Sequence, residues 1–313
     1  MRACLVTGGA GFIGSHIAEV LAQRGDRVRV LDNLSTGSRQ NMASFAAKVE
    51  FIEGDLTDAT AVAEAVRGVD CIFHQAALAS VPLSVDRPLD TNAACVTGTL
   101  NLLDQARRAG VRRLVFAASS AAYGDAPQAC KRESDLPVPL SPYAAAKLAG
   151  EHYCRAFFHT YGFESVCLRY FNVFGPRQDP KSPYSAVIPL FISAMLAGRR
   201  PVVYGDGLQS RDFTYVEDVV YGNLLAADAK GVAGRTINVA TGRSINLLEL
   251  IRLLNKMLGL EVVPIHEAPR PGDVRESTAD ITLARNLLGY APRVDFEEGL
   301  RRSIGYYRLL AAT

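Results

Sequence analysis

The chain has 313 residues, of which 49% are hydrophobic and 21% charged, and its formal net charge is +2. This balance is typical of a protein with a sizeable core, built as one large domain or as two that share a cleft. Basic residues are spread along the chain, which argues against a nucleic-acid partner. No stretch reaches the roughly 18 apolar residues that a membrane span needs. The six cysteines form no Cys-x-x-Cys pair, so we expect a cytoplasmic protein with no bound metal.

The first half of the chain alternates short apolar runs with amphipathic stretches. The apolar runs predict strands over residues 2–7, 27–31, 49–52, 70–73, 112–117 and 164–169. The amphipathic stretches predict helices over residues 12–24, 58–67, 86–109 and 142–161. Such alternation predicts an α/β fold with a doubly wound parallel sheet of the Rossmann type.

The second half is less regular, because prolines interrupt it at 176–189, 201 and 269–271. Residues 246–258 and 296–310 have the spacing of amphipathic helices, which we expect to cover a smaller α/β lobe. We assign residues 1–168 and about 212–242 to the larger domain, and about 169–211 and 243–313 to the smaller lobe.

A glycine-rich turn follows the first predicted strand. Gly8, Gly11 and Gly14 are spaced Gly-x-x-Gly-x-x-Gly, and Phe12 and Ile13 lie between the last two. Glycine lets the backbone turn tightly and approach a pyrophosphate, which the free N–H groups at the helix start would bind. Glycine is also common in turns that bind no ligand, so the motif indicates a pyrophosphate site only together with the residues around it.

Acidic residues after the next two strands supply that context. Asp32 ends the second strand, and Asn33, not an arginine, follows it. A carboxylate there hydrogen-bonds a ribose 2′-hydroxyl and repels a 2′-phosphate, which favours NAD over NADP. Asp55 and Leu56 follow the third strand, where Asp55 would meet the adenine amino group. The alternative for Asp32 is a simple turn residue.

Tyr143 and Lys147 are spaced i and i+4 at the start of a predicted helix, so they share one face. Tyrosine has an ordinary pKa of about 10. A nearby ammonium and a positively charged nicotinamide would both stabilise the phenolate and lower that pKa. Lys147 would also hold the nicotinamide ribose by its hydroxyls. Tyr-x-x-x-Lys also occurs by chance in many chains.

Ser119 and Ser120 follow the fifth strand, at the sheet edge where ligands bind in such folds. Ser119 would relay a proton between substrate and Tyr143 or orient the hydroxyl that is oxidised. The alternative is that both serines only cap the next turn.

With these motifs in the expected order, the sequence resembles the extended short-chain dehydrogenases/reductases, and most closely the UDP-N-acetylglucosamine 4-epimerases among them. The resemblance spans nearly the whole chain. It includes His74–Ala77, Asn92, Arg169–Pro176, Ser210–Phe213 and Gly272–Arg275. It implies that the larger domain binds NAD, with Ala76, Ala77 and Asn92 contributing to the cofactor site.

The resemblance also implies a reaction. Tyr143 takes the proton of the sugar 4-hydroxyl while hydride leaves C4 for NAD⁺. The 4-keto sugar then turns about its link to the diphosphate, and hydride returns to its other face. C4 is inverted without net redox change, so the enzyme must hold UDP firmly and the hexose loosely.

Matching positions imply a UDP-sugar site in the smaller lobe, to which Ser119 and Ser120 would also contribute. Asn172 would meet the diphosphate, and Arg211 and Arg270 would supply positive charge for it. Tyr204 would lie beside the uracil and Asp273 near the uridine ribose. The alternative for each arginine is a surface ion pair.

Substrate choice depends on pocket volume in such enzymes. Ser277 and Ala79 are small where relatives restricted to UDP-glucose carry larger residues. They favour UDP-GlcNAc/UDP-GalNAc interconversion, with UDP-glucose/UDP-galactose activity as well. Ala121 departs from the serine or threonine that close relatives often have, which leaves the fine preference open.

Four alternatives stay open to different degrees. A dTDP-glucose 4,6-dehydratase would need an acid pair where this chain has Ser120 and Ala121. A UDP-glucuronate 4-epimerase or decarboxylase would need a cation for the sugar carboxylate, and Arg87 is the nearest. A strict UDP-glucose 4-epimerase would share the mechanism. A non-catalytic NAD-binding regulator would commonly lack Tyr143 or Lys147, and this chain has both.

Similar proteins form homodimers through a four-helix bundle. Residues 92–109 and 142–161 would be the helices that pair here, with Leu100, Leu103, Tyr153 and Phe157 as contacts. The alternative is that these side chains belong to the chain's own core.

Overall fold

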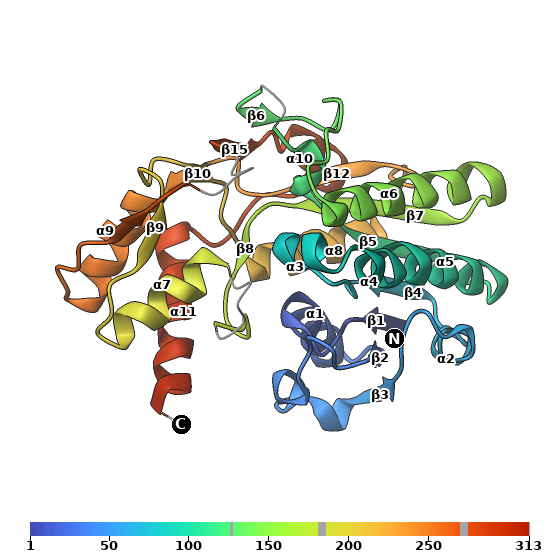
Figure 1. The fold of residues 1–313 in the computed structure, drawn as a ribbon. Coiled ribbons are helices and arrows are strands. Elements are labelled where there is room, and N and C mark those ends of the chain that lie inside the picture. The colour runs from blue at the N-terminus through green and yellow to red at the C-terminus, as the bar shows by residue number, and fades with distance from the viewer. Residues whose placement is uncertain (126–127, 181–185, 270–274, 313) are drawn as a thin grey trace.

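The computed structural model describes residues 1–125, 128–180, 186–269 and 275–312. Seven strands form one parallel sheet in the order β12-β7-β5-β4-β1-β2-β3 (Figure 1). These strands are β1 (Ala3–Thr7), β2 (Arg27–Asp32), β3 (Val49–Glu53), β4 (Cys71–His74), β5 (Arg113–Ser119), β7 (Glu164–Tyr170) and β12 (Thr236–Val239). The doubly wound parallel sheet is confirmed, and the six predicted strands all lie within two residues of their expected ends.

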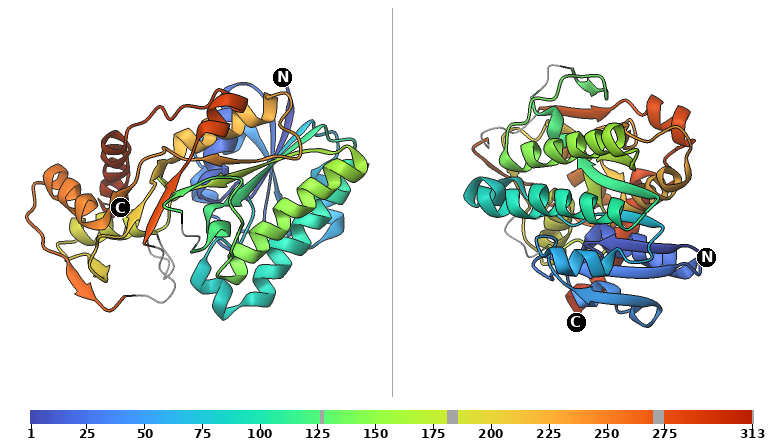
Figure 2. Two further views of the ribbon diagram at one scale, coloured as in Figure 1. Left: turned by 90° about the horizontal axis from the view of Figure 1, so that it is seen from above. Right: turned by 90° about the vertical axis from the view of Figure 1, so that its right-hand side faces the viewer.

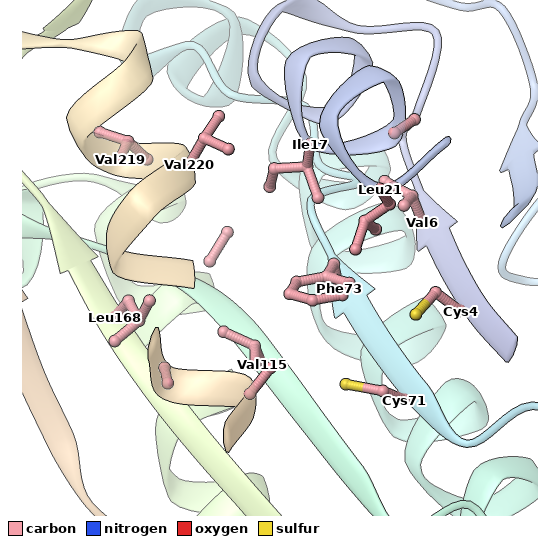
Figure 3. Close-up of a cluster of buried hydrophobic side chains, with 14 of the residues drawn as sticks. Cys4, Val6, Ile17, Leu21, Cys71, Phe73, Val115, Leu168, Val219 and Val220 are labelled. Atoms are coloured by element: carbon pink, nitrogen blue, oxygen red, sulfur yellow. The ribbon is translucent and has the colours of Figure 1, made fainter. Parts of the chain in front are cut away.

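Helices cover both faces of the sheet, so every residue of β1 and β4 is buried. On one face lie α1 (Phe12–Gln23), α8 (Val216–Asp228) and α10 (Thr282–Leu288). Figure 3 shows the core on this side, where Ile17 and Leu21 of α1 and Val219 and Val220 of α8 meet the sheet. On the other face lie α2 (Ala59–Ala65), α5 (Gly98–Arg108) and α6 (Pro142–Tyr161).

A second lobe stands at one side of the sheet (Figure 2, left). Its own apolar core holds side chains of α7 (Val187–Leu196), α9 (Leu247–Leu258) and α11 (Phe296–Ala312). Short strands complete it: β6 (Cys130–Lys131), β10 (Ser210–Arg211), β13 (Ile245–Asn246) and β15 (Glu276–Ala279) in one sheet, β9 (Val202–Tyr204) with β14 (Ile265–Glu267), and β8 (Val173–Phe174) with β11 (Thr214–Tyr215). The two helices predicted here correspond to α9 and α11.

The structure has several short helical segments where one helix was predicted over residues 86–109. A short α3 (Val81–Asp86) precedes α4 (Pro88–Asn92), a wider π-helical turn (Ala93–Thr97) follows, and α5 completes the run. Proline at the first position of α4 has no N–H to continue a preceding helix, which explains the break. The π turn adds a residue and rotates the side chains that follow it.

Two of the four side chains expected at a dimer interface lie instead in the chain's own core. Leu103 is fully buried and Phe157 is 8% exposed, both in the core between the sheet, α5 and α6. Leu100 and Tyr153 are partly buried against the same core. Across the described ranges, the structure has no helix with both the length and the apolar surface to cross a membrane.

Candidate active site

A cavity of about 1160 Å³ runs along the carboxyl ends of the strands and reaches the second lobe. Gly8 follows β1, Asn33 follows β2, Gln75 follows β4 and Ser120 follows β5, and all four line it. The order of the sheet reverses between β1 and β4, which is where ligands bind in doubly wound folds. The volume exceeds the roughly 300–1,000 Å³ of a site for one small molecule, so it accommodates two ligands together.

The glycine turn has the geometry that its sequence predicts. Gly8 has a φ of +66°, and its N–H donates to the carbonyl of Leu31 at 2.8 Å. A Cβ on Gly8 would lie 2.6 Å from the backbone nitrogen of Ala76, and one on Gly14 would lie 2.1 Å from the carbonyl oxygen of Gly8. Both glycines are therefore required by space, and they bring α1 against the end of β1.

His74 supports this turn from beneath. It is fully buried, and its ring nitrogens hydrogen-bond Thr7 Oγ1 at 2.7 Å and Thr99 Oγ1 at 2.9 Å. Burial, with the Lys147 ammonium nearby, lowers the pKa of His74 to about 3, so the ring is neutral. This fixed ring joins the ends of β1 and β4 to α5.

Asp32 is held in place by its backbone neighbours. Its two carboxylate oxygens accept from the N–H of Ala10 at 2.9 Å and of Leu34 at 2.8 Å. Asp32 also lines the cavity. The turn role and the binding role proposed from sequence are thus compatible, because each carboxylate oxygen has a second lone pair.

Asn33 and Asp55 lie beside each other at the same end of the cavity, where Leu56 also lines it. The Asn33 amide donates to Asp55 Oδ2 at 2.6 Å. Partial burial would raise the pKa of Asp55, but hydrogen bonds from Thr57 and Asn33 outweigh it and the pKa is lowered. Asp55 is therefore ionised at neutral pH.

The start of α6 fixes Tyr143 and Lys147. Ser141 caps the helix by accepting from the N–H of Ala144 at 3.2 Å, and Pro142 occupies the first helical position. One turn after Tyr143, Lys147 donates from Nζ to the carbonyl of Ala117 on β5 at 2.8 Å. Tyr143 and Lys147 both line the cavity.

Ser119 joins β5 to this pair. Its Oγ accepts from the N–H of Ala121 at 3.2 Å, so it caps the 3₁₀ turn Ser120–Tyr123. The same hydroxyl lies close enough to the Tyr143 phenol to lower its pKa. Ser119 is thus both a turn cap and a partner of the tyrosine.

The pKa of Tyr143 departs from the expectation. Burial raises it to about 12, and the Ser119 hydroxyl opposes that rise only in part. Lys147, which is bonded to Ala117, is not among the groups that lower it. Burial likewise lowers the pKa of Lys147 itself. A further positive charge at the site is needed to make Tyr143 a base near neutral pH.

Three of the predicted substrate residues meet at the far end of the cavity. Arg211 on β10 and Ser277 on β15 are paired across neighbouring parallel strands, and Asn172 follows β7. All three line the cavity, as does Ser120. The Arg211 guanidinium donates from Nη1 to the carbonyl of Ser210 at 2.8 Å. A cation and a small side chain therefore lie side by side.

Other predicted residues are not brought into this set. Asn92 is exposed at the end of α4, because Thr91 and Cys95 form the buried face; Ala93 and Ala94 line the cavity instead. The role expected for Asn92 in the cofactor site stays a prediction. Tyr204 ends β9 and is not among the described lining residues. Arg270 and Asp273 lie outside the described residues.

A family model described as the NAD dependent epimerase/dehydratase family matches residues 4–240. The chain belongs to this family. A UDP-glucose 4-epimerase from Mycolicibacterium smegmatis is 38% identical over 308 residues, which are 97% of this chain and 98% of that protein. This epimerase/dehydratase is therefore an enzyme of the extended short-chain dehydrogenase/reductase type, and NAD is its cofactor.

Solved structures agree over nearly the whole chain. A UDP-N-acetylglucosamine 4-epimerase from Methanobrevibacter ruminantium M1, in complex with UDP-N-acetylmuramic acid, is 41% identical with a TM-score of 0.95, and the match covers 99% of both chains. A UDP-glucuronic acid 4-epimerase from Bacillus cereus, in complex with NAD and a fluorinated UDP-glucuronic acid, is 30% identical with a TM-score of 0.92, and the match covers 98% of this chain and 99% of that one.

The residues present fit NAD. No side chain caps the start of α1, where Gly11 precedes the first turn, and such a helix start binds a pyrophosphate. The space above Gly8 and Gly14 admits no side chain. The carboxylate of Asp32 stands where a ribose hydroxyl is recognised.

Several residues that line the cavity of this epimerase/dehydratase were not predicted from the sequence. The largest group belongs to α3 and α4, whose lining members are Val81, Leu83, Val85 and Asp90. Tyr123, Lys131, Gln178 and Asp179 also line it. Gln75 and Tyr170 could have been found, because each stands at the end of a predicted strand. The others come from loops that carry no recognisable signal.

Proposed function

We propose that this enzyme is an NAD-dependent 4-epimerase of UDP-hexoses that interconverts UDP-GlcNAc and UDP-GalNAc and also accepts UDP-glucose and UDP-galactose. The observation that carries the proposal is that Ser119 and Tyr143 line one cavity with Arg211 and Ser277. The two residues that would transfer the proton and the two that would bind the substrate thus line one continuous cavity. Relatives along the whole chain act on UDP-sugars, which supports the same substrate class.

Tyr143 and Ser119 move the proton in this proposal. The phenolate of Tyr143 accepts the proton of the sugar 4-hydroxyl, directly or through the Ser119 hydroxyl, while the C4–H bond breaks. Bound NAD⁺ would supply a hydride acceptor and a positive charge beside the phenol. That charge is what the raised pKa of Tyr143 requires. Lys147 on α6, which is held by its hydrogen bond to Ala117 of β5, orients the nicotinamide ribose.

The substrate end holds the diphosphate and leaves the hexose room. Arg211 and Asn172 bind the phosphates. Ser120 contacts the sugar. Ser277, next to Arg211, leaves volume for a 2-acetamido group. Tyr204, Arg270 and Asp273 complete the uridine side. In this assignment residues 1–168 and about 212–242 bind NAD, and the remainder binds the sugar nucleotide.

The alternatives are less well supported. Arg87 lines the cavity, as a uronate enzyme would need, but its guanidinium is paired with Asp90 at 2.5 Å, which offsets its charge. Ser120 and Ala121 both face the cavity, and neither supplies the acid pair of a dehydratase. A strict UDP-glucose 4-epimerase is disfavoured by the small Ser277. A non-catalytic regulator has no need of Ser119, Tyr143 and Lys147 together at one cavity.

We further propose that two copies form a homodimer through α5 and α6. Both helices are long and lie next to each other on one face of the sheet (Figure 1). Leu100 and Tyr153 keep part of their surface exposed and are the contacts that remain from the four expected.

Product analysis tests the proposed reaction. The purified protein is incubated separately with UDP-GlcNAc, UDP-glucose and UDP-glucuronate, and the C4 epimers are separated by chromatography. Conversion of the first two supports the proposal. Conversion of UDP-glucuronate alone would show that Arg87 does recognise a carboxylate, and conversion of none would refute 4-epimerisation of these sugars.

A further inference from the structure

A loop between the two ligand ends carries an ion pair that the proposed reaction does not use. Residues 172–179, here called the substrate loop, follow β7 and include the two-residue strand β8. Asn172, Val173, Gln178 and Asp179 line the cavity, whereas Arg177, between them, does not. The side chain of Arg177 instead contacts the cofactor-binding part of the molecule.

Arg177 and its neighbour are bonded to α1. Arg177 Nη2 lies 2.5 Å from Glu19 Oε2, and the two side chains are only 16% and 20% exposed. Arg177 Nη1 is 3.4 Å from Ser15 Oγ. His16 donates from Nε2 to the carbonyl of Pro176 at 3.0 Å. Consecutive residues of the loop thus contact consecutive turns of the helix that begins at the glycine turn.

The backbone of Arg177 is strained. Its φ is +68°, and Leu34 is the only other non-glycine residue in the described ranges with a positive φ. A side chain that bears a Cβ rarely adopts this region, and it persists only where surrounding contacts impose it. The contacts with Glu19 and His16 are those constraints. The contacts that fix the position of the loop therefore outweigh the conformational cost of the positive φ at Arg177.

The loop is also held from the second lobe. Tyr307 of α11 donates to the carbonyl of Gln178 at 2.7 Å, and the carbonyl of Asn172 accepts from the N–H of Thr214 at 3.1 Å. Phe12 and Ile13, at the start of α1, pack against the core of that lobe. The substrate loop therefore lies between α1 and the second lobe and contacts both.

We propose that Arg177 is a positioning residue, which holds the substrate loop against the cofactor helix through Glu19 and so fixes the UDP diphosphate relative to NAD. The inference rests on the proposed function, in which UDP is held firmly while the hexose turns. Arg177 is not among the residues that line the cavity. Its ion pair with Glu19 fixes the positions of the lining residues that flank it in the loop, which are Asn172 before it and Gln178 and Asp179 after it.

Arg177→Gly and Glu19→Gln test this in the purified holoenzyme. Glycine adopts a positive φ freely, so the first variant removes the ion pair and keeps the turn. Glu19→Gln leaves the loop sequence intact. Calorimetry with UDP is expected to show an affinity about tenfold weaker in both variants. KM for the sugar nucleotide should rise similarly while kcat stays within about threefold, because the lost contact serves binding rather than chemistry.

Arg302→Ala is the matched control. Arg302 pairs with Glu217 and Glu298 on the surface between α8 and α11, away from the loop. It should leave UDP affinity unchanged. A lower melting temperature with unchanged UDP affinity in Arg177→Gly and Glu19→Gln would overturn the positioning role. A wild-type protein that binds no UDP would overturn the proposed function with it, so the two failures are distinguishable.

Discussion

Lys147 Nζ donates to the carbonyl oxygen of Ala117 at 2.8 Å, which ties the first turns of α6 to the strand that ends in Ser119. Gly150 makes this contact possible, because a Cβ there would lie 2.4 Å from the Phe116 ring. The bond fixes Tyr143 and Ser119 relative to each other through rigid elements rather than loops. Proton transfer depends on such fixed geometry.

Ser119→Ala should shift the pH dependence of the reaction. The Ser119 hydroxyl lowers the pKa of Tyr143 against the rise to about 12 that burial causes. Its loss raises that pKa, so less phenolate is present at any pH below it. The acid limb of kcat/KM should therefore move up by about one pH unit, with lower activity at neutral pH. A limb that stays in place would show that Ser119 does not act on Tyr143; Ser134→Ala on the surface serves as the control.

Asp32→Asn should weaken the preference for NAD over NADP. The amide keeps one acceptor, but it loses the charge that repels a 2′-phosphate and one of the two backbone bonds to Ala10 and Leu34. We expect less NAD to remain on the purified protein and the NAD/NADP affinity ratio to fall about tenfold. Asp58→Asn, at the exposed cap of α2, is the control. An unchanged ratio would contradict the role given to Asp32.

Ser277→Tyr should separate the two classes of substrate. The larger side chain fills the space beside Arg211 and is expected to lower kcat/KM for UDP-GlcNAc about a hundredfold relative to UDP-glucose. Steady-state assays with both sugars give the ratio, and Ser277→Ala should leave it near the wild-type value. Equal loss on both sugars would mean that Ser277 does not control the acetamido pocket.

Arg169→Met should destabilise the fold. Arg169 on β7 binds Glu151 on α6 through two hydrogen bonds of 2.8 and 2.7 Å, and both residues are about 4–5% exposed. Removing one partner leaves a buried charge unpaired, which costs about 3–5 kcal/mol of unfolding free energy. Urea unfolding measures it.

The double variant Arg169→Met/Glu151→Leu should recover most of that loss, because no charge is left buried. Arg39→Met, which breaks an exposed pair with Glu53, should cost under about 1 kcal/mol. An Arg169→Met cost as small as that of Arg39→Met would contradict the burial argument.

Local chemistry explains why much of the fold could be predicted. The six strands are apolar and brief because both faces of the sheet are covered, and Gly8 and Gly14 are dictated by close backbone approach. Tyr143 and Lys147 need only helical spacing and a cap to share a face. Each of these sequence patterns lies within one helix or strand or at its end, so it can be recognised without knowledge of distant contacts.

The rest depends on contacts distant in sequence. β12 has four residues and joins the sheet only by pairing with β7, so no periodicity indicates it. Asn92 is not among the described lining residues, because the orientation of α4 and the π turn is set by packing against α6. The positive φ of Arg177 follows from partners on α1 more than 150 residues earlier, which no local pattern records.

The most direct test of transient oxidation at C4 is the fate of the hydrogen on that carbon. UDP-GlcNAc that carries deuterium at C4 is incubated with the enzyme in ordinary water, and the C4 position of the UDP-GalNAc product is examined by NMR. Full retention of deuterium at the inverted carbon is the predicted result, since the hydride leaves and returns within the site. Replacement by solvent hydrogen, or no inversion at all, would contradict the mechanism assigned to Tyr143, Ser119 and NAD.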